Sequence, residues 1–155
     1  MFRSTLRSIF FIVLFGGGLV SSADALTFNL PTNGDNVVGH MQWTQVMPGD
    51  TFSSLGRRYD VGYYQLVEAN PGVNPDQPTP GTLIVIPTQF VLPPVPRTGI
   101  VVNLAELRIY YYPPNSGKVV TYPIGIGRQG WDTPVGIMNI TEKTVNPTWV
   151  VPKSI

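Results

Sequence analysis

The stretch from Gln45 to Pro87 most constrains the fold of this chain, because it places two helical patterns between two strand-like runs. Apolar residues recur at helical spacing in two sets, which are Phe52, Leu55 and Tyr59, and then Tyr63, Leu66 and Val67. The strand-like runs lie at 43–47 and 83–86. Asp60-Val61-Gly62 separates the helices, and Asn70-Pro71 ends the second because proline disfavours helix in the residue before it. The pattern predicts the order β-α-α-β.

The turn Pro48-Gly49-Asp50-Thr51 precedes the first predicted helix. Asp50 or Thr51 can act as its N-cap, because either side chain can accept a hydrogen bond from a free N–H group of the first turn. A proline-rich loop at 74–81 joins the second helix to the strand at 83–86, which we expect to be buried.

These residues resemble a LysM domain, and the motif covers the whole expected module. The matching runs are Val46-x-Pro48-Gly49-Asp50-Thr51, Tyr59-x-Val61, Leu66-x-x-x-Asn70-Pro71 and Gly81-x-x-Ile84-x-Ile86-Pro87. Phe52 departs from the pattern, because the family usually has leucine there. The resemblance implies binding to a glycan that contains N-acetylglucosamine, which in bacteria is peptidoglycan.

The resemblance also implies a shallow groove between the loop that enters the first helix and the loop that leaves the second. The glycan-binding residues carried over to this chain are Gly49, Asp50, Thr51, Phe52, Asn70, Pro71, Gly72 and Val73. Each has a structural alternative. Gly49 and Asp50 would serve only the turn and the cap, and Asn70 would only end a helix. Phe52 is better explained as a core residue, because so small a module has few apolar groups to spare.

Composition excludes several classes of function. Apolar residues make up 43% and charged residues 12% of the chain, which argues against a disordered or nucleic-acid-binding protein. There is no cysteine and one histidine, His40, so we expect no disulfide, no metal site and no cofactor. Without Arg3, Arg7 and Asp24, the 10 basic and 9 acidic residues become 8 of each, so no net charge favours nucleic acid or anionic lipid.

The first 25 residues have the layout of a secretory signal peptide. Arg3 and Arg7 form a basic region, an apolar run follows, and Ala23-Asp24-Ala25 provides a cleavage site. The alternative is a membrane anchor, but the apolar run of about 12 residues is shorter than the ~20 needed to span a bilayer. We therefore expect a mature chain that begins at Leu26, has no membrane span and, in a Gram-negative bacterium, lies in the periplasm.

We divide the rest of the chain around the LysM module, which we place at 42–87. Residues 26–41 form a lead-in that is either an edge strand or a loop. Residues 88–98, with Pro93, Pro94 and Pro96, are expected to form a stiff, extended connector of polyproline II type.

A second unit is expected at 99–155. Strand patterns lie at 100–104, 107–112, 119–126 and 135–140, with a hairpin loop at 113–117. They predict an antiparallel meander, so the fold class is α+β, with a βααβ module followed by an incomplete, mainly-β domain.

This unit resembles the N-terminal part of an L,D-transpeptidase catalytic domain of the YkuD type, in the subgroup that carries a LysM module. The matching runs are Val102-Asn103-Leu104, Leu107-x-Ile109-Tyr110, Tyr122-Pro123-Ile124-Gly125-Ile126-Gly127, Thr133-Pro134-x-Gly136, Asn146-Pro147-Thr148-Trp149 and Val151-Pro152. The resemblance implies acyl transfer by a histidine-activated cysteine, which cross-links peptidoglycan or attaches an envelope lipoprotein as the acyl acceptor. This chain has no cysteine and ends at Ile155, so we assign no catalytic residue and expect it to be truncated before the catalytic motif and inactive alone.

The sequence therefore leaves three hypotheses open. The chain is the first part of an L,D-transpeptidase, a non-catalytic LysM protein that binds peptidoglycan, or a structural envelope protein without a ligand. An open sheet leaves an unpaired edge. We therefore expect the LysM module to fold and the remainder to be poorly ordered.

Overall fold

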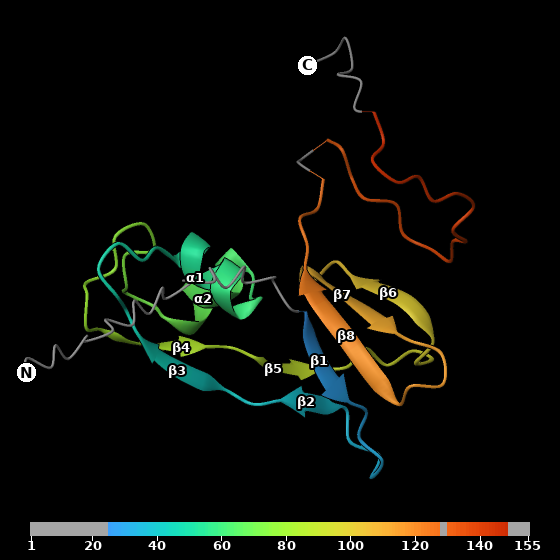
Figure 1. Ribbon diagram of the computed structural model, residues 1–155, viewed down its shortest axis with the longest axis horizontal. Helices are drawn as coiled ribbons and strands as arrows, with labels where there is room; N and C mark the ends of the chain where they lie inside the picture. The colour runs from blue at the N-terminus through green and yellow to red at the C-terminus, as the bar shows by residue number, and fades with distance from the viewer. Residues whose placement is uncertain (1–24, 128–129, 149–155) are drawn as a thin grey trace, which may run out of the picture. The chain divides into compact units, whose positions relative to one another are not determined.

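The computed structural model describes residues 25–127 and 130–148 (Figure 1). The predicted signal peptide, up to residue 24, and the end of the chain from Trp149 lie outside the described residues. The chain divides into two compact units, residues 1–124 and 125–155. Two helices and several antiparallel strands in open sheets give the α+β class that the sequence predicts.

The predicted βααβ order is confirmed. Strand β3 (Gln42–Gln45) is followed by helices α1 (Phe52–Tyr59) and α2 (Tyr63–Ala69) and by strand β4 (Leu83–Ile86). β3 and β4 pair antiparallel, with Gln42 opposite Ile86. The core between the helices and this sheet consists of Val46, Phe52, Leu55, Val61, Leu66, Ile84 and Ile86. β4 buries one face only, since Leu83 is exposed, so the expectation of a fully buried strand is wrong.

The junction between the two helices depends on one residue in a left-handed conformation and one close contact. Asp60 has φ of 56° and caps α1, and its N–H group donates to the carbonyl of Gly56. A Cβ atom on Gly56 would lie 2.7 Å from the carbonyl oxygen of Val61, which is closer than real Cβ contacts. Glycine inside this helix therefore allows α2 to start directly after α1.

Strands occur in both segments that flank the module. β2 (Val37–Gly39) lies in the predicted lead-in and pairs antiparallel with β5 (Gln89–Val91) in the predicted connector. Residues 89–91 of the connector, which we expected to be extended and partly of polyproline II type, form a paired β-strand. The two strands find each other because β3 and β4, which are already paired, each continue into one of them after two residues.

A four-stranded antiparallel sheet forms the other part of the first unit. It contains β1 (Leu26–Asn29), β6 (Gly99–Asn103), β7 (Arg108–Tyr112) and β8 (Lys118–Pro123), in the order β1-β8-β7-β6. Figure 1 shows β1 along one side of β8. The lead-in thus supplies an edge strand, one of the two alternatives left by the sequence.

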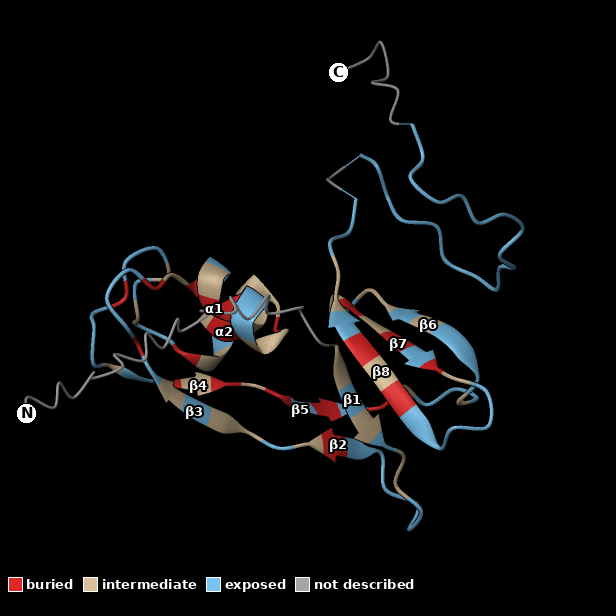
Figure 2. Ribbon diagram, in the orientation of Figure 1, coloured by how far each residue is buried: buried red, intermediate tan, exposed pale blue. Residues whose placement is uncertain are grey.

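The second core lies between this sheet and the β2–β5 pair. Its buried apolar residues are Val38, Phe90, Leu92, Tyr110, Tyr112 and Val119, with Leu26, Phe28, Leu30 and Val101 packed against them. In Figure 2 the buried positions alternate along β8. The expectation that everything outside the LysM module is poorly ordered is therefore wrong for residues 99–123, because the lead-in and the connector provide the surface on which the sheet is buried.

Arg108 is a fully buried cation in the second core. Its guanidinium carbon lies 4.0 Å from the centre of the Phe90 ring. Nη1 donates to the Thr121 hydroxyl at 3.1 Å, and Nη2 donates to the carbonyl of Asp60 at 2.7 Å. Burial lowers the pKa of Arg108 to about 10, so the side chain stays positive at neutral pH. Arg108 therefore joins β7 to the end of helix α1.

The second unit contains no helix or strand within residues 125–127 and 130–148. A strand at 135–140 was expected, and that expectation is wrong. Its apolar side chains are exposed, with Val135 at 83% and Ile137 at 102%, and Gly136 has φ of 140°. Figure 2 colours the described part of this unit almost wholly as exposed. A strand needs a partner for its backbone groups, and no described segment pairs with this one.

Candidate functional site

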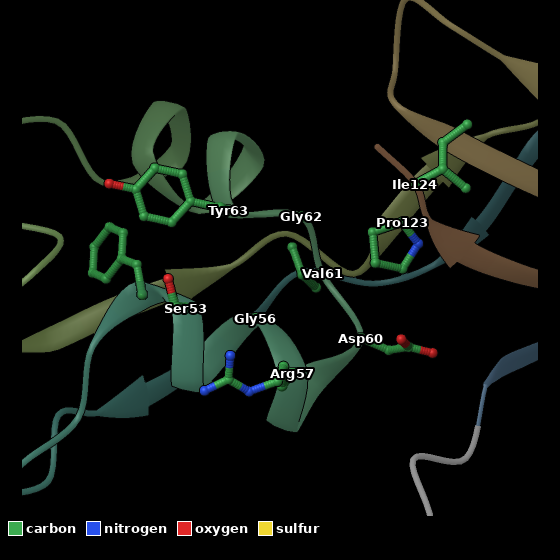
Figure 3. Close-up of a pocket in the computed structure, with 10 residues that line it drawn as sticks. Ser53, Gly56, Arg57, Asp60, Val61, Gly62, Tyr63, Pro123 and Ile124 are labelled. Atoms are coloured by element: carbon green, nitrogen blue, oxygen red, sulfur yellow. The ribbon is translucent and has the colours of Figure 1, made fainter. Parts of the chain in front are cut away.

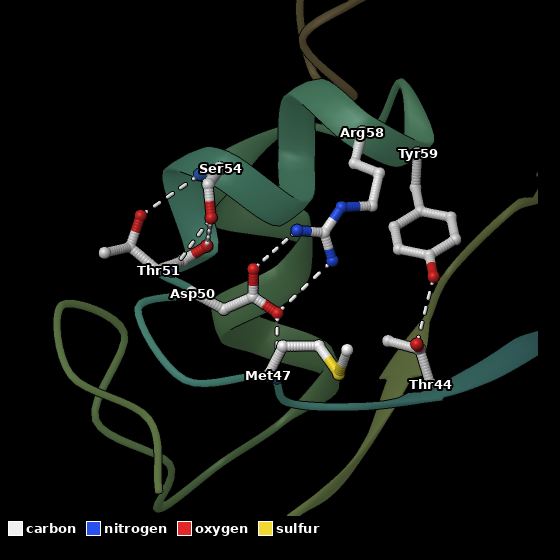
Figure 4. A network of polar contacts seen from close by, with 7 residues as sticks. All are labelled: Thr44, Met47, Asp50, Thr51, Ser54, Arg58 and Tyr59. Carbon is white, nitrogen blue, oxygen red and sulfur yellow. Dashed lines mark hydrogen bonds and ion pairs between the residues drawn. The ribbon is translucent and has the colours of Figure 1, made fainter. Parts of the chain in front are cut away.

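The turn before α1 is held by the Asp50 side chain, whose carboxylate is already bonded to other groups of the protein. The Asp50 carboxylate accepts hydrogen bonds from Arg58, at 2.6 Å from Nη2 and 3.2 Å from Nη1, and from the Met47 N–H group at 2.9 Å (Figure 4). Arg58 lies in α1, eight positions after Asp50 in the sequence. The hydrogen bond from Arg58, then that from Met47, lowers the pKa of Asp50. Asp50 is therefore a buried anion with its partners supplied.

Thr51 is the N-cap of α1, which decides between the two residues that the sequence offered. Its hydroxyl accepts from the Ser54 N–H group at 3.1 Å, and the Ser54 hydroxyl accepts from the Thr51 N–H group at 2.9 Å. This is a reciprocal capping box, and Figure 4 shows it beside the Asp50–Arg58 pair. The Thr51 side chain is half-buried and committed to the helix end.

Asn70 joins the end of α2 to strand β4. Its side-chain nitrogen donates to the carbonyls of Leu66 at 2.9 Å and Val85 at 2.8 Å, and its side-chain oxygen accepts from the Val85 N–H group at 2.7 Å. Asn70 is 7% exposed, and these bonds engage both polar atoms of its buried side-chain amide. The side chain positions the loop that follows it.

The two predicted loops lie next to each other. The N–H group of Phe52 donates to the carbonyl of Pro75 at 2.8 Å, which brings the start of α1 against the segment after the second loop. The Phe52 side chain is fully buried in the core and faces no solvent. Val73 is half-buried and packs on the same core. The structure thus separates the eight predicted residues into supports and an open surface.

The open surface is formed by Gly49, Pro71 and Gly72, which are exposed. Both glycines are in the left-handed region, with φ of 84° and 83°. Among the described residues, neither glycine N–H group has a hydrogen-bond partner within the protein. These two amide groups are therefore open to a ligand that carries hydrogen-bond acceptors.

Sequence reasoning missed three residues that support this surface. Arg58 fixes Asp50, Pro75 accepts the bond from Phe52, and Val85 holds Asn70. The Asp50–Arg58 pair had a detectable signal, because an acidic residue before a helix and a basic residue two turns later lie on one side of it. The other two contacts use backbone groups, whose partners no residue type reveals.

A second hollow lies at the junction of the two helices. It has a volume of about 450 Å³, and its lining includes Arg57 and Asp60, which point away from each other in Figure 3. The full lining is Phe52, Ser53, Gly56, Arg57, Asp60, Val61, Gly62, Tyr63, Pro123 and Ile124. Only Phe52 belongs to the predicted glycan site, so this hollow is a different place on the molecule.

The sequence has no cysteine. Among residues 25–127 and 130–148, no three His, Cys, Asp or Glu side chains are grouped to hold a metal ion. No helix within those same ranges is long and apolar enough to cross a membrane.

The fold and the loops define a protein with a βααβ recognition module joined to an antiparallel sheet. Residues 45–87 match the family model of the LysM domain, and residues 97–155 match that of the L,D-transpeptidase catalytic domain, YkuD. The chain therefore carries a LysM domain followed by part of an L,D-transpeptidase catalytic domain, and it is similar to bacterial L,D-transpeptidases over most of its length.

Three bacterial relatives illustrate this similarity. "Probable L,D-transpeptidase YcfS" of Escherichia coli strain K12 is 43% identical over 143 residues, which are 90% of this chain and 45% of the relative. "Probable L,D-transpeptidase YbiS" of the same strain is 39% identical over 147 residues, 93% of this chain and 48% of the relative. "Probable L,D-transpeptidase ErfK/SrfK" of Salmonella typhimurium is 40% identical over 129 residues, 81% and 42% of the two chains.

The alignments cover both matched domains, so the likeness is not confined to the LysM module. This chain spans about half the length of the curated relatives it matches. The activity of a whole L,D-transpeptidase is therefore only proposed for this chain.

Proposed function

We propose that this chain binds peptidoglycan through its LysM module, in the periplasm, after removal of a signal peptide that ends at Ala25. The glycan lies between the loop that carries Gly49 and the loop that carries Gly72, with Pro71 as an apolar contact for a sugar face. The observation that carries this proposal is the pair of exposed, unengaged glycine N–H groups on loops joined by the bond from Phe52 to Pro75.

The predicted site residues have different roles in this proposal. Gly49, Pro71 and Gly72 face the glycan, while the half-buried Val73 packs on the core. The side chains of Asp50, Thr51, Phe52 and Asn70 hold the two loops in place, and they contact the ligand at most through their backbone. Rigid loops favour affinity because little conformational entropy is lost on binding.

Co-sedimentation with insoluble peptidoglycan tests the proposal. We expect the wild-type chain to be retained and Pro71→Glu to lose about tenfold in affinity, or about 1.4 kcal/mol. Pro94→Glu is the matched control, because Pro94 is also an exposed proline but lies outside the module. Absence of wild-type retention, or equal retention of both variants, would overturn the proposal.

A second function follows from the match of residues 97–155 to the catalytic domain. We propose that the chain is the first part of an enzyme that transfers an acyl group from a peptidoglycan stem peptide to an amine, in a second stem or an envelope lipoprotein. In this proposal the cysteine nucleophile of the enzyme lies beyond Ile155. Sequencing the locus past Ile155 tests this proposal. An in-frame continuation with a cysteine supports it, and a stop codon leaves the non-catalytic LysM protein as the function.

A further inference from the structure

The first residue of β1, Leu26, lies beside Asp60, the residue that caps the C-terminus of α1. The backbone nitrogen of Leu26 donates to Oδ2 of Asp60 at 3.3 Å, between positions 34 residues apart. Leu26 is opposite Thr121 in the sheet, and β1 pairs with β8 over four residues. Arg108 donates to both the Thr121 hydroxyl and the Asp60 carbonyl, so the strand register also brings Leu26 to the neighbourhood of Asp60.

The Asp60 carboxylate is presented by a fixed backbone. Asp60 is in the left-handed region at the end of α1, and its N–H group is bound to Gly56. Its carbonyl accepts the bond from the buried Arg108. Each of these contacts uses the backbone, so the side chain remains available.

The carboxylate forms no ion pair among the described residues, although the buried Arg108 guanidinium lies close enough to interact with it electrostatically. The ion pair within that part of the chain joins Arg58 and Asp50. Arg57 lines the same hollow as Asp60 but points away from it (Figure 3). A charged acceptor thus faces a single neutral amide of Leu26, which leaves most of its hydrogen-bonding capacity unused.

We propose that Asp60 is a binding site for an ammonium group, and that its ligand is the N-terminus of the processed chain. The proposal rests on cleavage after Ala25, which belongs to the proposed function. Hydrolysis adds water across the Ala25–Leu26 bond, so that Ala25 takes the carboxylate and Leu26 takes the amine. The amine takes up a proton at neutral pH, because α-amino groups have pKa values near ~7.7–8.0.

Processing thus converts one weak donor into a cation with three. Charge-assisted hydrogen bonds are shorter and roughly twice as strong as neutral ones. The ion pair fastens β1, which closes one edge of the four-stranded sheet, to the LysM module. Removal of the signal peptide therefore strengthens the contact between the two parts of the first unit.

The other charges around this site act on the same amine. Asp60 and Arg57 come from α1, Arg108 comes from β7, and Glu106 precedes β7, while Thr121 on β8 is uncharged. Asp60 is bonded directly to the Leu26 nitrogen. Its effect exceeds that of Arg108, which binds the far side of the Asp60 backbone. The balance favours the protonated amine.

Titration of the α-amine tests the site. The chain from Leu26 to Ile155, released with a free N-terminus from a removable fusion, is labelled by ¹³C reductive methylation and followed by NMR against pH. We expect the amine pKa to lie about 0.5–1 pH unit higher in the wild type than in Asp60→Asn. Asparagine is suited to this exchange because it tolerates the left-handed conformation and removes only the charge. Asp76→Asn, at an exposed loop position, is the matched control and should leave the amine unchanged.

Two results would overturn the proposal. One is the same amine pKa in the wild type and in Asp60→Asn. The other is an intact mass, for the chain secreted from a bacterial host, that does not begin at Leu26. Peptidoglycan retention of the same proteins reports on the glycan site alone. Failure of glycan binding is therefore distinguishable from failure of the ammonium site.

Discussion

The Asp50 carboxylate and the Arg58 guanidinium form a two-bond ion pair, with Nη2 2.6 Å from Oδ1 and Nη1 3.2 Å from Oδ2. Arg58 is 46% exposed and Asp50 is 5% exposed at the side chain. Solvent screens the half-exposed Arg58 side chain, so the pair contributes less to stability than a fully buried ion pair, and the hydrogen bond from Met47 adds to its contribution. The pair fixes the first of the two loops that we propose to bind glycan.

Asp50→Ala should reduce the free energy of unfolding by about 1–3 kcal/mol, because it removes the part-buried acceptor of the Met47 N–H group and the partner of Arg58. Urea denaturation followed by tryptophan fluorescence measures the change. Asp76→Ala is the control, since that exposed side chain should change stability by no more than ~0.5 kcal/mol. Similar values for the two variants would show that the Asp50 contacts do not hold the turn.

The contribution of Asp50 should depend on pH in one direction. Its pKa in the folded protein is lowered from the ordinary 3.8, mainly by the bond from Arg58. The contribution is therefore complete above the unfolded pKa and is lost as the pH falls through the folded pKa. The difference in unfolding free energy between the wild type and Asp50→Asn should be constant from pH 5 to pH 7 and shrink below about pH 4. A difference that persists unchanged at pH 2.5 would contradict this assignment.

Asn70→Ala should destabilise the module by about 1–3 kcal/mol, because the N–H group of Val85 and the carbonyl of Leu66 lose their buried partner. Thermal unfolding of the full chain measures it. Asn74→Ala provides the comparison, since Asn74 is exposed and accepts bonds only within its own loop. If both substitutions lower the melting temperature equally, the Asn70 bonds do not join α2 to β4 as argued.

Gly56→Ala should be destabilising although alanine favours helix by about 1 kcal/mol. The added Cβ atom would lie 2.7 Å from the Val61 carbonyl, and both residues are buried. We expect a net loss of about 1–3 kcal/mol in urea denaturation, typical of overpacking. Ser53→Ala, at an exposed position of the same helix, should change stability little. A stabilised Gly56→Ala would mean that the helix junction can open without cost.

The helices could be predicted from sequence because their signals are local. Phe52 and Leu55 mark the buried face of α1, and Asn70-Pro71 marks the end of α2. The flanking strands could not be predicted in the same way. Leu26 pairs with Thr121, and Val38 pairs with Phe90, so each partner lies far along the chain.

The candidate site was predictable in position but not in detail. The loop motif located Gly49 and Gly72, which are exposed. It did not reveal that Asp50 and Asn70 are occupied by bonds within the protein, because those bonds depend on Arg58 and on the backbone of β4. Residue types indicate which groups can bind a ligand, and only the fold determines which are free to do so.

The most direct test of the proposed glycan site is an NMR titration of the ¹⁵N-labelled chain with soluble oligomers of N-acetylglucosamine. We predict that the amide signals of Gly49 and Gly72 shift with saturating dose dependence, and that Pro71→Glu weakens the response while Pro94→Glu does not. Saturating shifts that leave both glycines unchanged, or no shift with any oligomer, would contradict the placement of the glycan between these two loops.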